Sequence, residues 1–284
     1  MVTDDEAHRV IEAAWEAGIR YFDTAPLYGF GLSEQRLGHV LRSKPRNEFI
    51  LSTKVGRLMR PGGPPEPGQA WKGTPALNPV FDFSYDATMR SVEESLTRLG
   101  LDRVDVLLIH DPDEYYAEAL SGAYRALDRL RSEGTVKAIG AGMNQAEMLV
   151  RFARETNMDC FLLAGRHTLL DRSGDRELLP LCSERGISII AGGVFNSGIL
   201  ADPRPGGTFD YAAAPPDVVA RAQELAATCA RYGVELKAAA IQFPLRHPAV
   251  ASVLTGCRSV GELEENVRLF HAPVPEELWR QLDA

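Results

Sequence analysis

The sequence predicts an α/β fold, the TIM (β/α)8 barrel, from three observations. Short apolar runs alternate with segments of helical periodicity, which implies crossover connections and a parallel sheet. Several apolar runs end in a charged or titratable residue, as expected where a parallel barrel brings active-site residues to one face. The length of 284 residues, 45% of them hydrophobic, suits one such domain that spans residues 1–284.

The first periodic segment, DDEAHRVIEAAWEAG, predicts a helix that begins near Asp4 and ends at Gly18. Its acidic first turn lies where the helix dipole favours negative charge. Later segments rich in β-branched and aromatic residues are bounded by Gly, Pro or Asp, which is typical of buried strands. They predict seven strands, at 20–25, 49–55, 105–110, 138–143, 160–165, 188–194 and 250–256.

The segments between these strands carry apolar stripes at helical spacing, for which core packing is the expected role. They predict helices at 33–43, 84–100, 115–134, 145–157, 177–186, 217–233 and 259–270. The last residues, EELWRQLDA, predict an accessory helix over the outside of the barrel.

The predicted strands number seven, whereas a closed (β/α)8 barrel has eight. A closed barrel leaves no free edges, so a barrel without one strand exposes unpaired N–H and C=O groups on two strands. We therefore expect residues 20–25 and 250–256 to be edge strands. Either the true start codon lies upstream, or the protein is truncated and impaired.

Two connections are long. Residues 56–83 hold Trp71 and Phe81 among many Pro and Gly residues, and residues 195–216 include ADPRPGGTFDYAAAPP. Loops of this length in a compact domain are usually functional lids or disordered segments. We interpret the first as a loop that covers the substrate, with Trp71 or Phe81 as its apolar wall, rather than as a featureless linker.

Titratable residues stand at three predicted strand ends. Asp23 ends the first strand, with Tyr28 on the following loop, and Lys54 and His110 end the next two. Singly, each has a structural interpretation, as a helix cap, a loop aromatic, a solvated strand end or a core histidine. A charge after an apolar run is costly unless it is paired or functional, so the set of four favours an active site.

These four side chains suit acid–base catalysis by a phenol. An unperturbed phenol has a pKa near ~10, so Tyr28 needs a nearby cation to stabilise its phenolate at neutral pH. Lys54 can be that cation and Asp23 can keep it charged. His110 can orient a substrate oxygen or pass on a proton.

The chain resembles the aldo-keto reductase family. FDTAPLYGFGLSEQRLG, LSTKVG, LGLDRVDVLLIHDPD and LEENV match family patterns, and the resemblance covers nearly the whole chain. It implies a TIM barrel with the tetrad Asp23, Tyr28, Lys54 and His110, and a first strand before VTDDEA that helps to build the cofactor and substrate cleft. The segments VFDFSYDATMRSVEESLTRLGLDRVDVLLIHDPD and GGVFNSGIL are most similar to the branch of aldose 1-dehydrogenases and pyridoxal 4-dehydrogenase.

No strand is followed by GxGxxG or GxxxxGK[ST], which disfavours a Rossmann or P-loop nucleotide site. LTGCRSV instead combines a glycine with the amides that open the helix at Ser259, which is a ready anion site. The family uses this turn for a cofactor phosphate; a helix cap by Ser259 is the structural alternative.

The resemblance implies a partial set of cofactor-binding residues. Asn144 is similar to a ligand of the nicotinamide amide, Phe195 and Ser197 to a segment that holds the pyrophosphate, and Glu265 and Asn266 to positions that contact adenine. The family's usual Ser-Asn pair, glutamine and stacking tyrosine are absent where this chain has Gly142-Met143, Ala164 and Gly192.

The residues near the last strand favour NAD over NADP. Relatives that prefer NADP carry basic residues where this chain has Gly256 and Glu262, and Arg258 is the only nearby cation. A carboxylate repels a 2′-phosphate and can bond a 2′-hydroxyl.

Composition indicates which classes of partner the protein can bind and where in the cell it is expected. The net charge of −8 argues against a nucleic-acid partner, which needs a basic surface. No stretch has the length of a membrane span, and the acidic N-terminus lacks a signal peptide's apolar core, so we expect a cytoplasmic protein. The four widely spaced cysteines predict neither a disulfide framework nor a metal site.

The resemblance implies an oxidoreductase that acts on a small molecule, oxidising an aldose hemiacetal of the L-fucose or D-threo-aldose type to its lactone. Tyr28 would take the hydroxyl proton as hydride leaves for the nicotinamide. One alternative is pyridoxal as the substrate. Another is a cofactor-sensing or regulatory barrel without turnover, which the absent first strand favours and the intact tetrad opposes.

Overall fold

The computed structural model describes residues 2–62 and 73–283, so Trp71 lies outside the described residues. The chain divides into two compact units. The first consists of Met1–Met143, Asn157–Cys160 and Cys257–Val260, and the second of Asn144–Thr156, Phe161–Gly256 and Gly261–Ala284.

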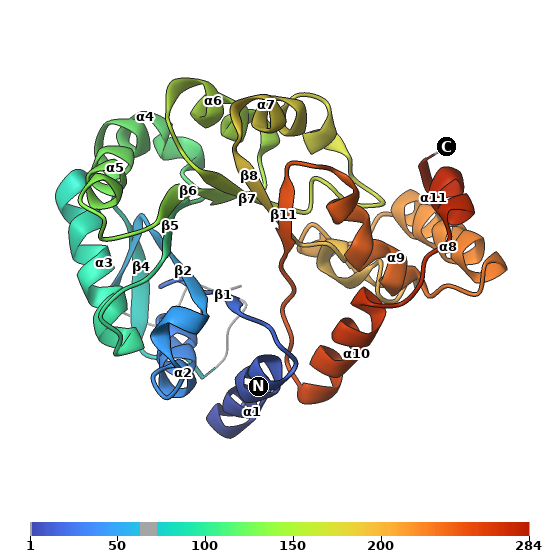
Figure 1. The fold of residues 1–284 in the computed structure, drawn as a ribbon, viewed down its shortest axis with the longest axis horizontal. Coiled ribbons are helices and arrows are strands. Elements are labelled where there is room, and N and C mark those ends of the chain that lie inside the picture. The colour runs from blue at the N-terminus through green and yellow to red at the C-terminus, as the bar shows by residue number, and fades with distance from the viewer. Residues whose placement is uncertain (1, 63–72, 284) are drawn as a thin grey trace. The chain divides into compact units, whose positions relative to one another are not determined.

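Four parallel strands form the sheet of the first unit, in the order β1-β2-β5-β6. They are β1 (Tyr21–Asp23), β2 (Ile50–Val55), β5 (Val106–His110) and β6 (Ala138–Met143). Helices lie on one side of these strands, as Figure 1 shows for α3 and α5. The helices of this unit include α1 (Asp4–Glu16), α2 (Leu32–Leu41), α3 (Tyr85–Leu99) and α5 (Tyr124–Ser132).

The strand register brings the predicted tetrad residues to the carboxyl end of this sheet. Asp23 of β1 pairs with Ser52 of β2, two residues before Lys54. His110 pairs with Gly142 at the end of β6. Because all four strands run in parallel, their carboxyl ends lie side by side, and the side chains that follow them meet there.

A buried carboxylate fastens α2 to its neighbours. Glu34 is fully buried; it accepts a hydrogen bond from Thr53 of β2 (2.7 Å) and pairs with Arg98 of α3 (2.5 Å). Gly38 of α2 lies so close to α3 that a Cβ there would stand 2.0 Å from the carbonyl oxygen of Leu99. The segment that carries Tyr28 thus leads into a tightly held helix.

The second unit contains three parallel strands in the order β7-β8-β11. They are β7 (Cys160–Ala164), whose first residue counts with the first unit, β8 (Ser188–Gly192) and β11 (Val250–Val253). Its helices are α6 (Ala146–Glu155), α7 (Leu178–Arg185), α8 (Pro216–Arg231), α9 (Leu236–Gln242), α10 (Val260–Phe270) and α11 (Glu276–Asp283). The predicted accessory helix is α11, whose Leu278 and Trp279 pack in one core cluster with α8 and α9.

All seven predicted strands are present, each within a few residues of its predicted bounds. Among the described residues, β1 pairs only with β2 and β11 only with β8, as the strand count predicted for the two edges. Both edge strands are short, with three and four residues.

The predicted long loops are partly strand. Within residues 56–83, β3 (Arg57–Pro61) and β4 (Leu77–Phe81) form an antiparallel pair, so Phe81 stands on a strand rather than on a loop. Within 195–216, β9 (Thr208–Phe209) pairs with β10 (Ala212–Ala213). Pro and Gly content hid both hairpins, since those residues also mark turns.

The sequence analysis also missed two helical features. It did not predict α9, and the single helix predicted at 115–134 contains a π-helical turn, Ala119–Ala123, between α4 (Tyr116–Glu118) and α5. Gly122 fits in that turn because it has no Cβ, which would lie 2.4 Å from the carbonyl oxygen of Phe83. Short 3₁₀ turns occur at Arg46–Glu48, Asp113–Tyr115, Ser173–Asp175, Asn196–Gly198 and Phe243–Arg246.

The close approach of α2 and α3 leads to a paired prediction. Gly38→Ala should lower the free energy of unfolding by at least about 2 kcal/mol, because a backbone carbonyl occupies the space its Cβ needs. Gly261→Ala, also in a helix but with no atom within 4 Å of its Cβ, should raise it by about 0.5 kcal/mol. Urea unfolding of both variants measures this; equal stability of the Gly38 variant and the wild type would contradict the tight packing.

Candidate active site

A buried ion pair between Asp23 and Lys54 lies at the centre of the predicted tetrad. Lys54 Nζ is 2.6 Å from Asp23 Oδ2, and the two side chains are 1% and 3% exposed. The same ammonium donates to the carbonyl oxygen of Thr24 (2.9 Å). Asp23 accepts a second hydrogen bond at its other oxygen, from Ser52 Oγ (2.5 Å), so both carboxylate oxygens are satisfied.

Tyr28 and His110 lie beside this pair. Lys54 Nζ stands 4.6 Å from the centre of the Tyr28 ring, and the Tyr28 and His110 rings meet edge to face at 5.6 Å. A pocket of about 290 Å³ opens between α1 and α2, and Tyr28 and Cys257 contribute to its wall. The structure therefore brings together all four side chains that the sequence singled out.

The surroundings set the charge of each group. Burial raises the pKa of Tyr28; the Lys54 cation acts in the opposite direction but does not cancel it. Burial alone would lower the pKa of Lys54, yet Asp23 and Tyr28 outweigh it, so the pKa is raised and the ammonium stays charged. Burial, with the cations of Lys54 and Arg57, holds the pKa of His110 well below its usual value.

This arrangement can move a proton at the phenolic oxygen of Tyr28 beside a fixed cation and a neutral imidazole. A neutral imidazole can donate one N–H to a substrate oxygen. The sequence interpretation expected Lys54 to lower the phenol pKa. In the structure burial is the larger effect, so the cation limits the rise rather than reversing it.

Phe81, the second predicted substrate contact, lies in the same unit. It is 43% exposed and stacks on Tyr115 with ring centres 5.6 Å apart. The guanidinium of Arg57 lies 5.0 Å from the Phe81 ring centre. Arg57 in turn pairs with Asp111, the residue after His110. Trp71, the other predicted wall residue, lies outside the described residues.

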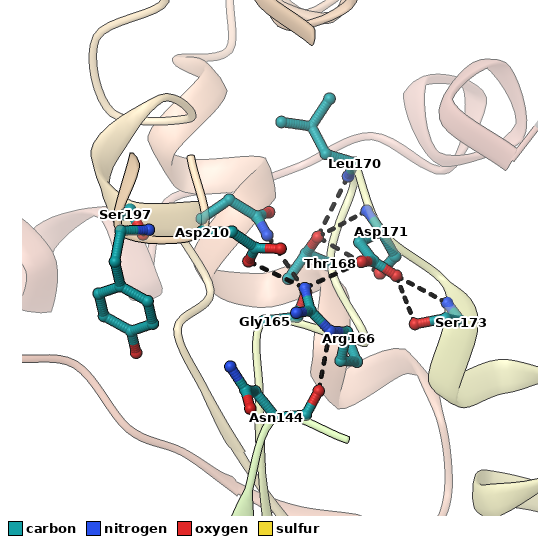
Figure 2. Close-up of polar contacts among 11 residues, drawn as sticks. Asn144, Gly165, Arg166, Thr168, Leu170, Asp171, Ser173, Ser197 and Asp210 are labelled. Carbon is teal, nitrogen blue, oxygen red and sulfur yellow. Dashed lines mark hydrogen bonds and ion pairs between the residues drawn. The ribbon is translucent and has the colours of Figure 1, made fainter. Parts of the chain in front are cut away.

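In the second unit, Arg166 fixes the backbone of the predicted nicotinamide ligand Asn144. Arg166 Nε donates to the Asn144 carbonyl oxygen (2.9 Å), as Figure 2 shows. Its Nη1 reaches Asp171 (3.1 Å) and Asp210 (2.9 Å). The Asn144 side-chain amide is not part of these bonds, because they use the main-chain oxygen.

Ser197 lies on a left-handed stretch of backbone. Asn196, Ser197 and Gly198 have φ values of 44°, 58° and 108°. The amide of Tyr211 donates to Ser197 Oγ (3.0 Å), and Asp210 beside it pairs with Arg166 (Figure 2). The tip of the β9–β10 hairpin is thus attached both to the Ser197 segment and to Arg166.

One polar atom in this segment lacks a partner. Asn196 Nδ2 donates to the Gly165 carbonyl oxygen (3.2 Å), but its buried Oδ1 has no hydrogen-bond partner among the described residues. An unsatisfied buried acceptor costs free energy unless a ligand supplies the donor. A pyrophosphate offers no donor, so this oxygen would suit a hydroxyl or an amide N–H of the cofactor instead.

Lys237 connects two other predicted cofactor residues. Its ammonium bonds the carboxylate of Glu265 and lies 5.7 Å from the Phe195 ring centre. Asn266, one residue on, is buried. Glu265 is therefore already neutralised by a cation, and the Lys237–Glu265 pair beside Phe195 carries no net charge.

The residues expected to select between NAD and NADP lie around the start of α10. Gly256 is exposed, with no atom within 4 Å of the position that a Cβ would take, and Arg258 is exposed as well. Glu262 lies in the first turn of the helix and is partly buried.

The sequence analysis missed four charged residues with well-defined partners: Arg57, Asp111, Arg166 and Lys237. Arg57 and Asp111 carried a usable signal, because each follows a predicted tetrad residue within three positions. Arg166 carried a similar signal, because it directly follows the predicted strand 160–165, whereas Lys237 follows no predicted strand.

Comparison with known proteins decides the family. The aldo/keto reductase family model matches residues 1–284. The chain belongs to the aldo-keto reductase family. This confirms the predicted resemblance and, with the structural likeness below, the TIM-barrel-like α/β fold class.

Individual relatives and a solved structure support the family assignment. Pyridoxal 4-dehydrogenase of Microbacterium luteolum is 44% identical over an alignment of 302 residues, which covers 99% of this chain and 88% of the relative. D-threo-aldose 1-dehydrogenase of a Pseudomonas species is 44% identical over 289 residues, with the same coverage. The holo form of aldo-keto reductase AKR11C1 from Bacillus halodurans superimposes with a TM-score of 0.77 at 26% identity, over 100% of this chain and 88% of that one.

This aldo-keto reductase is an oxidoreductase, and enzymes of the family use nicotinamide cofactors and act on small molecules. The relatives are named as dehydrogenases, which supports an enzyme over a regulatory barrel without turnover. Among the described residues, none of the helices has the length and hydropathy that a bilayer span requires. Within the same residues, no group of three or more His, Cys, Asp or Glu could hold a metal ion.

The buried ion pair yields a prediction about stability. Asp23→Asn leaves the Lys54 ammonium buried without a counter-charge, so the free energy of unfolding should fall by about 3–5 kcal/mol. Asp4→Asn, which removes an exposed partner of Arg36, should cost less than about 0.5 kcal/mol. Urea unfolding at pH 7 compares the two; similar small losses would show that Asp23 does not compensate the lysine.

Proposed function

We propose that this aldo-keto reductase oxidises the hemiacetal carbon of an aldose of the L-fucose or D-threo-aldose type to a lactone, with NAD as the hydride acceptor. One observation carries the proposal: a buried Asp23–Lys54 pair lies against Tyr28, and Tyr28 against His110. The 44% identity to a D-threo-aldose 1-dehydrogenase over nearly the full chain supports the aldose.

Each residue has a role that follows from its surroundings. Tyr28 accepts the proton of the substrate hydroxyl, and the adjacent Lys54 stabilises the phenolate that must form first. Asp23 holds that ammonium charged and in place. His110, neutral because burial lowers its pKa, donates an N–H to the substrate oxygen and so orients it.

The raised pKa of Tyr28 predicts how the reduction and oxidation reactions depend on pH. The phenol holds its proton at neutral pH, so it is ready to act as an acid in reduction. Oxidation needs the phenolate, and below the pKa the phenolate fraction rises about tenfold with each unit by which the pH increases. Aldose oxidation is therefore favoured by alkaline conditions.

The cofactor would be held by residues of the segments that resemble the family's cofactor-binding positions. Asn144 would bond the nicotinamide amide, Phe195 and Ser197 would line the pyrophosphate, and Glu265 and Asn266 would contact adenine. The unpartnered Asn196 Oδ1 can accept a hydrogen bond from a hydroxyl or amide N–H of the cofactor. When bound, the nicotinamide accepts hydride; the chain itself supplies binding, orientation and the proton acceptor.

Pyridoxal is a second candidate substrate, favoured by a specific observation. The stacked rings of Phe81 and Tyr115 are exposed and offer a surface on which an aromatic substrate can stack. A 44% identical relative is named pyridoxal 4-dehydrogenase. The hemiacetal form of pyridoxal would lose hydride while Tyr28 takes its hydroxyl proton, as proposed for the aldose.

The test of the proposed function is NAD reduction by the purified enzyme with L-fucose, D-arabinose and pyridoxal. Tyr28→Phe should lower kcat by at least about 100-fold, the usual loss of an acid–base group, while NAD affinity stays within about threefold. Fluorescence titration with NAD provides the binding control. Wild-type turnover by the Tyr28 variant would show that another group takes the proton.

Glu262 is the residue we expect to disfavour NADP. Glu262→Arg replaces a repulsion of the 2′-phosphate by a charge-assisted contact, so the ratio of kcat/KM for NADP over NAD should rise by about 10- to 100-fold. Arg258→Gln is the matched control and should shift the ratio the other way if that cation already binds phosphate. An unchanged ratio in the Glu262 variant would place cofactor selection elsewhere.

A further inference from the structure

Asp111 stands in an unusual position directly after His110. Its φ of 40° is left-handed, which costs free energy for any residue with a side chain and is frequent at functional sites. One carboxylate oxygen lies 3.5 Å from His110 Nε2 and 2.8 Å from Arg57 Nη2. The backbone thus places a carboxylate beside the imidazole that the proposed mechanism assigns to orienting the substrate.

The Arg57–Asp111 pair differs from the bracing ion pairs of the same unit. Asp105 is 2% exposed and is held by Arg46, by Lys137 and by the amide of Leu51, so its lone pairs are used within the fold. Asp111 is 31% exposed, and Arg57 is its hydrogen-bond donor among the described residues. Its second oxygen remains able to accept a hydrogen bond from a ligand.

Arg57 is also incompletely bonded. Its side chain is 13% exposed, and its buried Nε has no hydrogen-bond partner among the described residues. The guanidinium has five N–H donors, so its accessible part can donate to a ligand oxygen. The pair therefore offers both an acceptor and a donor next to His110.

An apolar surface adjoins these polar groups. The Arg57 guanidinium lies over Phe81, and Phe81 stacks on Tyr115 at an interplanar angle of 11°. A pyranose combines hydroxyls, which donate and accept hydrogen bonds, with C–H faces that pack on aromatic rings. A carboxylate, a guanidinium and an aromatic face side by side are complementary to that combination.

We propose that Asp111 and Arg57 form a hydroxyl-recognising subsite that binds the ring hydroxyls of the aldose next to its reacting carbon and so sets specificity for polyhydroxylated substrates. This inference rests on the proposed aldose oxidation. The hydroxyl beside the reacting carbon donates to Asp111, while a neighbouring hydroxyl oxygen accepts from Arg57. His110 keeps its N–H for the oxygen at the reacting carbon.

The test combines enzyme variants with deoxy substrates. Asp111→Asn keeps the size of the side chain but removes its charge, and should lower kcat/KM for the aldose by about 10- to 100-fold, mainly through KM, the range for a hydrogen bond to a charged group. The ratio of kcat/KM for the aldose over 4-nitrobenzaldehyde, which has no hydroxyls and is assayed in reduction, should fall by a similar factor.

The substrate side gives the sharper measurement. In the wild type, removal of the critical hydroxyl, tested with the 2-deoxy and 3-deoxy forms of the preferred aldose, should cost about tenfold or more in kcat/KM. In Asp111→Asn the same removal should cost less than about threefold, because Arg57 keeps the amide oxygen as its acceptor and the amide NH2, a donor, replaces the oxygen that accepted from the hydroxyl. Arg60→Gln is the control: it breaks an ion pair to Glu94 from the same strand and should leave every ratio unchanged.

The outcomes separate the two proposals. If the wild type oxidises no aldose, the proposed function is overturned and the subsite with it. If the wild type oxidises an aldose but Asp111→Asn lowers kcat/KM for aldose and aldehyde equally, or for neither, the subsite alone is overturned. Thermal melts of each variant identify a loss that comes from unfolding.

Discussion

The buried Asp23–Lys54 ion pair is the constraint on which the rest of the candidate site depends. A buried ammonium requires a counter-charge and further acceptors, and this one receives them from Asp23 and the Thr24 carbonyl. Asp23 and Thr24 both lie at the end of β1, so the Lys54 ammonium of β2 holds the end of β1 in place. The turn that follows brings Tyr28 beside the ammonium.

The same contacts explain how a three-residue edge strand keeps its place. Within residues 2–62 and 73–283, β1 pairs on one side only, and a ladder this short contributes few backbone hydrogen bonds. Side chains add to it: Tyr21 and Asp23 both bond Ser52 of β2, and Lys54 bonds the backbone after Asp23. The candidate catalytic arrangement and the anchoring of β1 therefore depend on the same side chains.

The strands and most helices could be predicted because apolar periodicity is local information. The elements that were missed lack that signal. Pro79 within LNPVF is typical of an edge or of no strand at all, so β4 could not be recognised. In α9, the run LKAAAIQ is apolar on nearly every side, and no helical period stands out from it. Both elements are fixed by long-range packing instead.

The tetrad could be predicted because a titratable residue after an apolar strand is conspicuous in sequence. Arg57 and Asp111 stand just after tetrad residues, but their pairing could not be predicted, since it joins positions 54 residues apart and depends on a hairpin that the sequence hid. This difference has a physical basis. The residues assigned to proton transfer stand on the parallel strands, whose ends are fixed by the repeating β/α pattern. The residues assigned to substrate hydroxyls stand on β3 and on a left-handed turn, outside that pattern, where sequence can change without moving the tetrad. The proposed subsite therefore lies on elements that the repeating β/α pattern does not constrain.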